Sequence, residues 1–274
     1  MNPQGLVDTV RPTFIVGNWK MHSTAAEATQ LTKAIVDGMG IMSGRHRVSV
    51  AVCPPFPYLA IVGEILRGSC VALGAQNLYP EKEGAFTGEV SPTMLIDLGC
   101  TYVILGHSER RHELGESDEF INQKIRVALT ARLNVILCVG ETFEQREANR
   151  TEAVLDRQVG QGLVEVPADI LNRVTIAYEP VWAIGSSGHE ATPQQAEDAH
   201  ALIRRRLARI YGEKTAHAVV IQYGGSVKPE NAASILTVNG VDGALIGGAS
   251  LHADQFLAIV RAGTCELETK GKSA

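Results

Sequence analysis

The chain has 274 residues, 45% hydrophobic and 20% charged, which is typical of a globular protein with a substantial buried core. Its net charge of −5 argues against a nucleic-acid-binding surface, and no apolar run approaches the roughly 20 residues that cross a membrane. Five cysteines without a Cys-x-x-Cys pair, together with a polar N-terminus, predict reduced thiols and a cytoplasmic protein.

Eight short apolar runs recur along the chain at intervals that leave room for helices. They lack polar alternation, which is typical of strands that are covered on both faces. The runs are TFIV from Thr13, VSVAV from Val48, VALGA from Val71, YVIL from Tyr102, NVILC from Asn134, VTIAY from Val174, AVVIQ from Ala218 and GALIG from Gly243.

Helical patterns with recognisable first turns separate these runs. The segments from Thr24 to Glu27 and from Thr192 to Gln195 are capping boxes, in which the first and last residues bond each other's backbone N–H groups. Ser91 precedes a proline at the first position of a helix, and Gly99 is a stop signal. This alternation predicts parallel strands joined by right-handed crossovers.

Eight strand–helix units are the number that closes a (β/α)₈ barrel, the α/β fold also called the TIM barrel. An open, doubly wound sheet is the alternative arrangement. No linker, charge block or low-complexity tract divides the chain. Residues 1–274 are therefore expected to form a single domain, with a loosely ordered N-terminal extension and C-terminal tail, ETKGKSA.

Residues with catalytic potential follow the ends of several of these strands. Each alone has an ordinary interpretation, as a solvated loop residue, a helix cap or a tight turn. Their shared placement favours function, because the C-terminal ends of barrel strands converge on one face. They are Asn18 and Lys20 after the first strand, His107 after the fourth, Glu179 after the sixth, Ser226 after the seventh, and Gly247 and Gly248 after the eighth.

A phosphate and a carbonyl group would suit this set. Glycine-rich turns leading into helices present free backbone N–H groups to a phosphate, and the loops after strands seven and eight are the usual phosphate site of this fold. Glu179 is a natural base for a proton on the carbon next to a carbonyl. Lys20, Asn18 and His107 can then stabilise the enolate oxygens. The set predicts isomerisation by proton transfer without a cofactor.

Other catalytic patterns are incomplete. GHSER and GGSVK lack the final glycine of the G-x-S-x-G hydrolase motif. HELGE and HEATP fail the HExxH zinc pattern, and neither a dinucleotide fingerprint nor a G-x-x-x-x-G-K-[ST] phosphate loop occurs. We therefore expect no metal, no cofactor and no hydrolase nucleophile.

Seven long segments follow one another in a specific order: GNWKM, GAQNLYPEKEGAFTGEVSP, ILGHSERR, LCVGET, AYEPVWAIG, YGGSVKP and GVDGALIGGASL. From Thr13 to about Val260 they resemble the triosephosphate isomerase family. The resemblance implies the interconversion of dihydroxyacetone phosphate and D-glyceraldehyde 3-phosphate, a step of glycolysis and gluconeogenesis.

The resemblance also implies a role for each matching residue. Glu179 would be the base that moves the proton between adjacent carbons. His107 would be the neutral electrophile that polarises the carbonyl, a pairing already known for this family. Lys20 would balance the negative charge of the substrate, Asn18 would hydrogen-bond its oxygens, and Glu109 would support the lysine.

By the same resemblance, the phosphate would be held by Ser226, Gly247, Gly248 and the backbone amides of Gly185 and the residues after it. Cys138 matches a family cysteine near the base, and we interpret it as a packed core thiol. The segment from Pro180 to Trp182 would be the first hinge of a loop that closes over the substrate and excludes water.

The loop after this hinge departs from the family pattern. The usual sequence is A-I-G-T-G-K-T-A, whereas Ala183–Ala191 reads AIGSSGHEA, one residue longer and with His-Glu in place of Lys-Thr. We expect the loop to close nevertheless, because Tyr223 and Ser226, which meet the closed loop in the family, are both present.

GAFTG, with Thr87 at its tip, matches the loop that enters a second subunit in the family, so a two-fold homodimer is expected. The partners expected are thus a triose phosphate and a second copy of the chain, with no nucleic acid and no membrane. Three alternatives stay open: an isomerase of a four-carbon phosphosugar such as L-erythrulose 1-phosphate, an aldolase in which Lys20 forms a Schiff base, and a phosphate-binding protein without activity.

Overall fold

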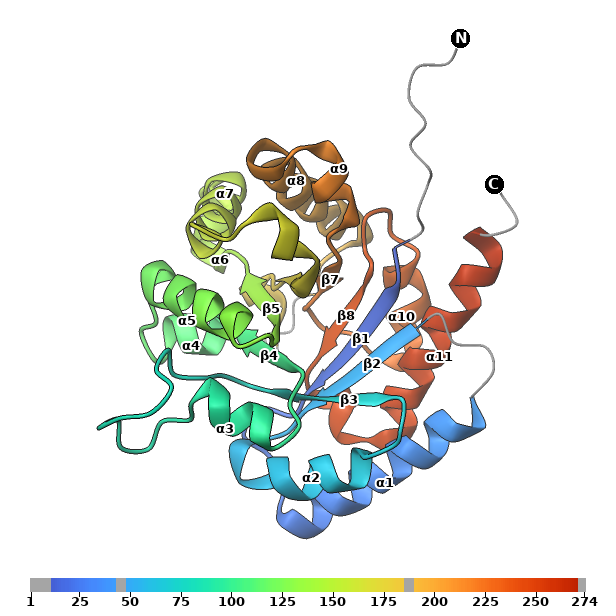
Figure 1. The fold of residues 1–274 in the computed structure, drawn as a ribbon. Coiled ribbons are helices and arrows are strands. Elements are labelled where there is room, and N and C mark those ends of the chain that lie inside the picture. The colour runs from blue at the N-terminus through green and yellow to red at the C-terminus, as the bar shows by residue number, and fades with distance from the viewer. Residues whose placement is uncertain (1–10, 43–47, 185–189, 271–274) are drawn as a thin grey trace.

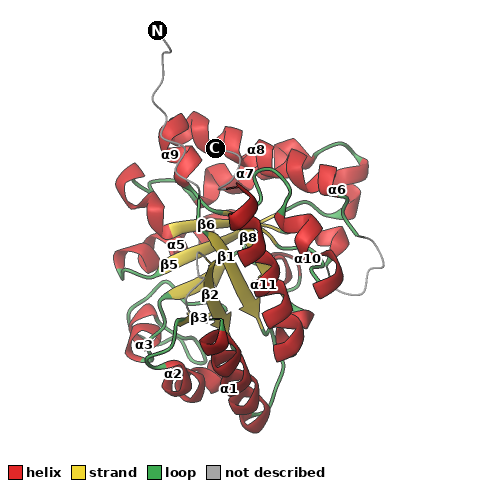
Figure 2. Ribbon diagram, turned by 90° about the vertical axis from the view of Figure 1, so that its right-hand side faces the viewer, coloured by secondary structure: helices red, strands yellow, loops and turns green. Residues whose placement is uncertain are grey.

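Eight parallel strands form a closed barrel in the computed structural model, which describes residues 11–42, 48–184 and 190–270. Each strand pairs with the next in sequence, and the first also pairs with the eighth. Figures 1 and 2 show the strands at the centre with helices around them. The strands are β1 (Thr13–Asn18), β2 (Val48–Cys53), β3 (Val71–Ala75), β4 (Tyr102–Leu105), β5 (Asn134–Val139), β6 (Val174–Tyr178), β7 (Ile221–Tyr223) and β8 (Gly243–Ile246). The predicted (β/α)₈ barrel is confirmed, and the doubly wound sheet is excluded.

The predicted caps begin several of the surrounding helices. Thr24 and Glu27 form the expected capping box, as do Thr192 and Gln195, and the Ser91 hydroxyl accepts a backbone N–H of the next helix. The helices are α1 (Ala25–Ile41), α2 (Leu59–Leu66), α3 (Pro92–Asp97), α4 (Ser108–His112), α5 (Asp118–Thr130), α6 (Phe143–Glu147), α7 (Thr151–Gly162), α8 (Pro193–Tyr211), α9 (Glu213–Ala218), α10 (Pro229–Leu236) and α11 (Ala253–Lys270), with the 3₁₀ turns η1 (Phe56–Tyr58), η2 (Ala168–Arg173), η3 (Val181–Ala183) and η4 (Gly248–Leu251).

The seventh strand is shorter than its sequence pattern predicts. We expected a strand from Ala218, but Ala218 ends α9 and the strand begins at Ile221. Arg204 of α8 donates hydrogen bonds to the carbonyls of Ala216 and Val219. This backbone therefore bonds to a guanidinium group instead of entering the barrel.

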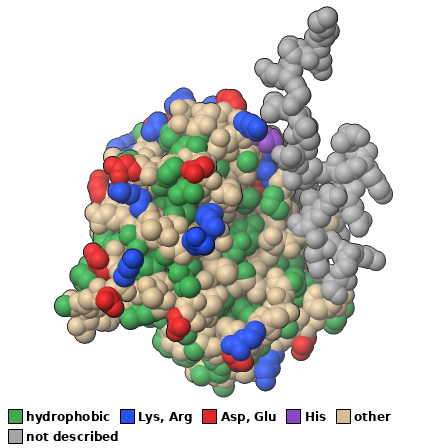
Figure 3. All heavy atoms as spheres, viewed as in Figure 1, with side chains coloured by type: hydrophobic (Ala, Val, Ile, Leu, Met, Phe, Trp, Pro, Cys, Tyr) green, Lys and Arg blue, Asp and Glu red, His purple; other side chains and the backbone are tan. Residues whose placement is uncertain are grey.

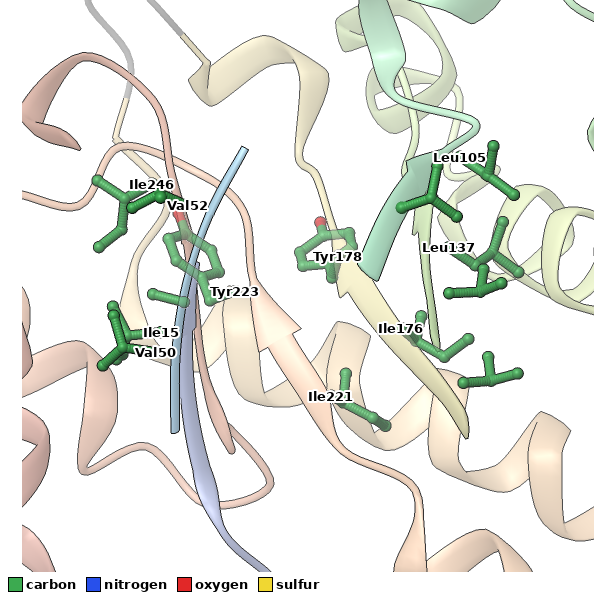
Figure 4. Close-up of a cluster of buried hydrophobic side chains, with 14 of the residues drawn as sticks. Ile15, Val50, Val52, Leu105, Leu137, Ile176, Tyr178, Ile221, Tyr223 and Ile246 are labelled. Carbon is green, nitrogen blue, oxygen red and sulfur yellow. The ribbon is translucent and has the colours of Figure 1, made fainter. Parts of the chain in front are cut away.

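Residues along each strand alternate between two buried layers, as successive side chains of a strand must. One layer packs against the helices, and Figure 4 shows part of it, including Ile15, Val52 and Ile176. The other fills the inside of the barrel. Burying a large aliphatic side chain contributes roughly 1.5–3 kcal/mol, so both layers hold the strands firmly. The inner layer comprises Phe14, Val16, Ala51, Cys53, Ile104, Ile136, Cys138, Ala177 and Leu245.

Charged side chains are dispersed over one face of the molecule. In Figure 3, Lys and Arg side chains alternate with Asp and Glu, and apolar side chains lie between them. Within the described ranges, no helix has both the length and the apolar character to cross a membrane.

Candidate active site

The C-terminal ends of the strands surround one cavity of about 440 Å³. Because the strands run parallel, side chains from distant parts of the sequence meet at this end of the barrel. Glu109 contacts Lys20 at the rim, and Gly185 lies outside the described residues. All the other predicted site residues line the cavity: Asn18, Lys20, His107, Glu179, Ser226, Gly247 and Gly248.

Lys20 is held in a strained backbone conformation. Its φ of +52° is unusual for a residue with a side chain and costs about 1–3 kcal/mol, so the surroundings must maintain it. Asn18 accepts the Lys20 N–H at 3.0 Å, and the Gln76 amide donates to the carbonyls of Lys20 and Cys53, both at 2.8 Å. The ammonium group meets Glu109 at 2.6 Å. These contacts aim the lysine side chain into the cavity.

His107 is the N-cap residue of α4, and its ring is almost fully buried. The backbone N–H of Glu109 donates to Nδ1 at 3.3 Å, and Nε2 lies 2.9 Å from a carboxylate oxygen of Glu179. Because an N–H group can only donate, Nδ1 keeps its lone pair and the ring proton resides on Nε2. In this tautomer the imidazole points its Nε2–H at Glu179.

Two opposing effects act on the pKa of His107. Burial lowers this pKa, whereas the charge and hydrogen bond of Glu179 and the charge of Glu109 together raise it by more, so the pKa lies above its ordinary value. A ligand that displaces Glu179 from Nε2 removes the strongest of the effects that raise the pKa. Burial, the charge of Lys20 and the backbone donor at Nδ1 then favour the neutral ring, against the charge of Glu109.

Glu179 follows β6 directly and is 2% exposed. Burial raises the pKa of its carboxyl group. His107 and the backbone N–H of Ser108, which donates at 2.9 Å, lower this pKa by more, so it is below the ordinary value. The group is therefore ionised at neutral pH. A Cβ on Gly224 would lie 2.9 Å from the Glu179 Cγ, so a glycine at that position leaves the side chain room to turn.

Small residues that follow β7 and β8 form another part of the cavity wall. Gly247 precedes η4, and a Cβ there would lie 3.4 Å from the Lys20 Cε, whereas a Cβ on Gly248 would enter open space. Backbone at this turn, together with Ser226, can therefore approach an anion closely. Gly185 and the rest of the loop to His189 lie outside the described residues, so the closing of this loop stays a prediction.

A buried carboxylate that the sequence analysis did not identify supports the segment after Glu179. Glu141, fully buried after β5, accepts hydrogen bonds from the Tyr178 hydroxyl, from the Trp182 indole N–H at 3.0 Å and from Arg146 at 3.0 Å. It links the end of β6 to η3, the expected first hinge. The signal was present in LCVGET, because Glu141 is another carboxylate placed shortly after a strand.

Cys138 lies in the inner layer of the barrel and is fully buried. Burial raises the pKa of its thiol well above the ordinary value, and the negative charge of Glu179 raises it further. A protonated, enclosed thiol is a poor nucleophile. This agrees with its interpretation as a packing residue. Within the described residues, no group of His, Cys, Asp and Glu is arranged to hold a metal ion.

His200 of α8 packs behind the site. Its ring meets the Tyr178 ring edge to face at 5.9 Å, and Nδ1 lies 3.0 Å from the Gly240 carbonyl. Burial lowers the pKa of His200 to about 4. The unfolded chain binds a proton near pH 6.5 and the folded ring does not, so this contribution to stability is complete above pH 6.5.

We expect that contribution to be lost as the pH falls from 6.5 to about 4, at about 1.4 kcal/mol per pH unit. Denaturant unfolding of the wild type and of His200→Gln at pH 7.0 and pH 4.5 measures it. Between these pH values the wild type should lose about 2–3 kcal/mol more than the variant. Equal losses in the two proteins would show that His200 titrates normally in the fold.

Comparison with known proteins covers the whole barrel. A family model described as Triosephosphate isomerase matches residues 13–263. The chain is 53% identical over 251 residues to a triosephosphate isomerase from Chloroflexus aurantiacus, covering 92% of this chain and 99% of the relative. One from Carboxydothermus hydrogenoformans is 55% identical over 252 residues, covering 92% and 99%. One from Treponema denticola is 51% identical over 246 residues, covering 90% and 96%.

Proposed function

The chain belongs to the triosephosphate isomerase family and interconverts dihydroxyacetone phosphate and D-glyceraldehyde 3-phosphate, and we propose that Glu179, His107 and Lys20 carry out this reaction. It is thus an intramolecular aldose–ketose isomerase of glycolysis and gluconeogenesis. The observation that best supports these roles is the 2.9 Å contact between His107 and Glu179, in a cavity that Lys20 also lines.

Glu179 begins the reaction as an ionised base. It removes a proton from the carbon next to the carbonyl, the electrons of that C–H bond form a carbon–carbon double bond, and the carbonyl oxygen becomes an enediolate oxygen. Glu179 must leave His107 to reach this proton, and the vacated Nε2–H then donates to the substrate oxygen. The hydroxyl proton of the enediolate then moves to the former carbonyl oxygen by way of His107 Nε2, and Glu179 returns its proton to the former carbonyl carbon, which leaves the new carbonyl on the neighbouring carbon.

Lys20 and the small residues that follow β7 and β8 hold the charged substrate. The Lys20 ammonium group offsets the negative charge of the enediolate and the phosphate, with Glu109 and Asn18 keeping it in position. Asn18 also lines the cavity and can hydrogen-bond a substrate oxygen. The phosphate is assigned to the wall that contains Ser226, Gly247 and Gly248, with the Gly185 loop completing it as in the family.

A coupled assay with three-carbon and four-carbon phosphosugars tests the substrate. We expect kcat/KM for dihydroxyacetone phosphate to exceed that for L-erythrulose 1-phosphate by about tenfold or more. A binding site that fits the smaller substrate lowers kcat/KM for a substrate with one more carbon by about this factor. The reverse preference would support the four-carbon alternative. Covalent labelling of Lys20 by borohydride in the presence of substrate would support the aldolase instead.

We also propose a two-fold homodimer formed through the loop that carries Thr87. This loop, between β3 and α3, projects from the body of the barrel in Figure 1. Phe86 is 40% exposed next to Thr87, although its ring packs on Tyr79 at 4.5 Å. Met21 is 93% exposed beside Lys20, and Leu114 is 63% exposed after α4. These apolar side chains near the catalytic groups suit a surface that receives the loop of a second copy.

Light scattering at micromolar concentration tests this assembly. The wild type should have twice the chain mass of 29.4 kDa, and Phe86→Asp should shift the population towards the monomer, because a charge on the loop tip cannot be buried without a partner. Val164→Asp is the matched control, since Val164 is 49% exposed and lies between α7 and β6, at the other end of the barrel. A monomeric wild type would refute the dimer.

We further propose that residues 1–274 act as one domain in the cytoplasm. Cys53, Cys70, Cys100 and Cys138 are free thiols, as a reducing compartment would keep them.

A further inference from the structure

Lys228 lines the same cavity as the proposed catalytic residues but has no part in the mechanism above. It lies two residues after Ser226, just before α10, and its ammonium group meets the Glu190 carboxylate at 3.1 Å. Glu190 stands where the family pattern has a threonine. The ion pair therefore joins the phosphate side of the cavity to a residue in which this chain departs from its family.

The backbone of Lys228 has a fixed position relative to the phosphate wall. Its N–H donates to the Asn231 side chain at 2.8 Å, and the Asn231 amide donates to the Ser226 carbonyl at 3.1 Å. The side chains of Lys228 and Glu190 are 56% and 60% exposed. Their charges thus face the solvent, and Lys228 also lines the cavity.

Lys20, the other lysine that lines the cavity, pairs with Glu109 at the rim, and Glu179 bonds to His107. Glu190 lies close enough to the buried Tyr223 for its charge to add to the effect of burial in raising the pKa of that phenol. A phosphate monoester carries a charge of about −1.5 to −2 at neutral pH, and the chain itself carries −5. A cation at the entrance therefore offsets a general repulsion.

We propose that Lys228 steers the phosphate of the incoming substrate into the cavity and that Glu190 limits this attraction by pairing with it. The inference rests on the proposed function, because it concerns access to the same site. Lys228 touches no reacting atom and is a positioning residue.

The energetics favour a kinetic role for this pair. An ion pair between two exposed side chains contributes little to stability. A unit charge at the entrance, however, acts over a screening distance of about 10 Å at 0.1 M salt and about 30 Å at 0.01 M, and so changes the rate of encounter with an anion. The expected signature is an effect on kcat/KM that salt abolishes, with kcat unchanged.

The test compares Lys228→Gln, Glu190→Gln and the double variant at about 0.01 M and 0.5 M ionic strength. At low salt, Lys228→Gln should lower kcat/KM about 3- to 5-fold, because it leaves Glu190 unpaired at the entrance. Glu190→Gln should raise it about 2- to 3-fold, and the double variant should lie within about 2-fold of the wild type. At high salt all four proteins should agree within about 2-fold.

Lys214→Gln and Glu213→Gln are the matched controls. They change the net charge equally, but both residues are exposed on α9, which precedes β7 and lies at the opposite end of the barrel. The controls should match the wild type at both salt concentrations. The proposal is overturned if Lys228→Gln behaves like Lys214→Gln, or if its loss persists at high salt or appears in kcat.

Binding of inorganic phosphate separates this inference from the proposed function. Calorimetric titration at low salt should show about 3-fold weaker binding to Lys228→Gln and tighter binding to Glu190→Gln than to the wild type, with no turnover required. If the three proteins show this order of phosphate affinities but the wild type does not isomerise triose phosphate, the result would contradict the proposed function alone. Unchanged phosphate affinity in both variants would contradict the steering role alone.

Discussion

Replacing Glu179 by glutamine should lower kcat by at least about 10³- to 10⁴-fold, since general-base assistance alone is worth about 10²–10⁴-fold and this base acts in both proton transfers. Glutamine has nearly the same size as glutamate but cannot take up a proton at neutral pH. KM should change little, because the groups assigned to the phosphate are untouched. The coupled isomerase assay measures both constants.

The fold of this variant should be intact, so the loss can be read as a loss of chemistry. The two carboxylate oxygens each accept one N–H group at 2.9 Å, from Ser108 and from His107, and the single amide oxygen of glutamine can keep the bond from Ser108 while the His107 ring, which lines the cavity, bonds to water. Circular dichroism and thermal unfolding should therefore resemble those of the wild type. Glu213→Gln, exposed on α9, is the control for the loss of one negative charge. A Glu179→Gln protein that keeps a tenth of the wild-type rate would remove Glu179 from the role of base.

Replacing Lys20 by glutamine should lower kcat by about 10²- to 10³-fold, the usual cost of losing one preorganised group that stabilises a developing oxyanion. KM should also rise, because the ammonium group interacts with the charged substrate before the reaction as well as during it. The two proposed roles thus differ in their kinetic signature. Glu179 affects kcat, whereas Lys20 affects kcat and KM together.

The Lys20 variant should remain folded. Glu109, which loses its partner, has a side chain that is 51% exposed and can be solvated. The backbone contacts of Asn18 and Gln76 that hold the strained turn do not depend on the lysine side chain. Steady-state kinetics beside the Lys214→Gln control measures the effect. A change confined to KM would mean that Lys20 contributes binding but no stabilisation of the enediolate.

Most of the barrel could be predicted because its signals are local. A strand that is buried on both faces has a continuous apolar sequence. A helix that begins with a capping box has a Ser or Thr followed three residues later by a Glu or Gln. The capping boxes at Thr24 and Thr192 form as expected. The sequence pattern predicted too early a start for β7. Arg204, over ten residues upstream, donates hydrogen bonds to the backbone before this strand, and a local pattern cannot indicate such a contact.

The reactive side chains of the site were predictable for the same reason. Each follows a strand, and parallel strands bring their ends together whatever lies between them in sequence. The supporting contacts were not predictable from the pattern. The Gln76 amide donates to the Lys20 carbonyl from 56 positions away in the sequence, and Glu141 accepts a hydrogen bond from Trp182, which is 41 positions away. Such pairings depend on the register of neighbouring strands and on side-chain directions, which only the folded barrel specifies.

A crystal structure with a phosphate-bearing, unreactive analogue of the substrate would show whether these side chains gather around one ligand. We predict that the phosphate lies against Ser226, Gly247 and Gly248. The carbonyl-type oxygen should lie within hydrogen-bonding distance of His107 Nε2 and Lys20 Nζ, and the Glu179 carboxylate about 3–3.5 Å from the carbon that carries the proton. A ligand bound elsewhere, or a Glu179 that still bonds His107 and stands away from the ligand, would contradict it.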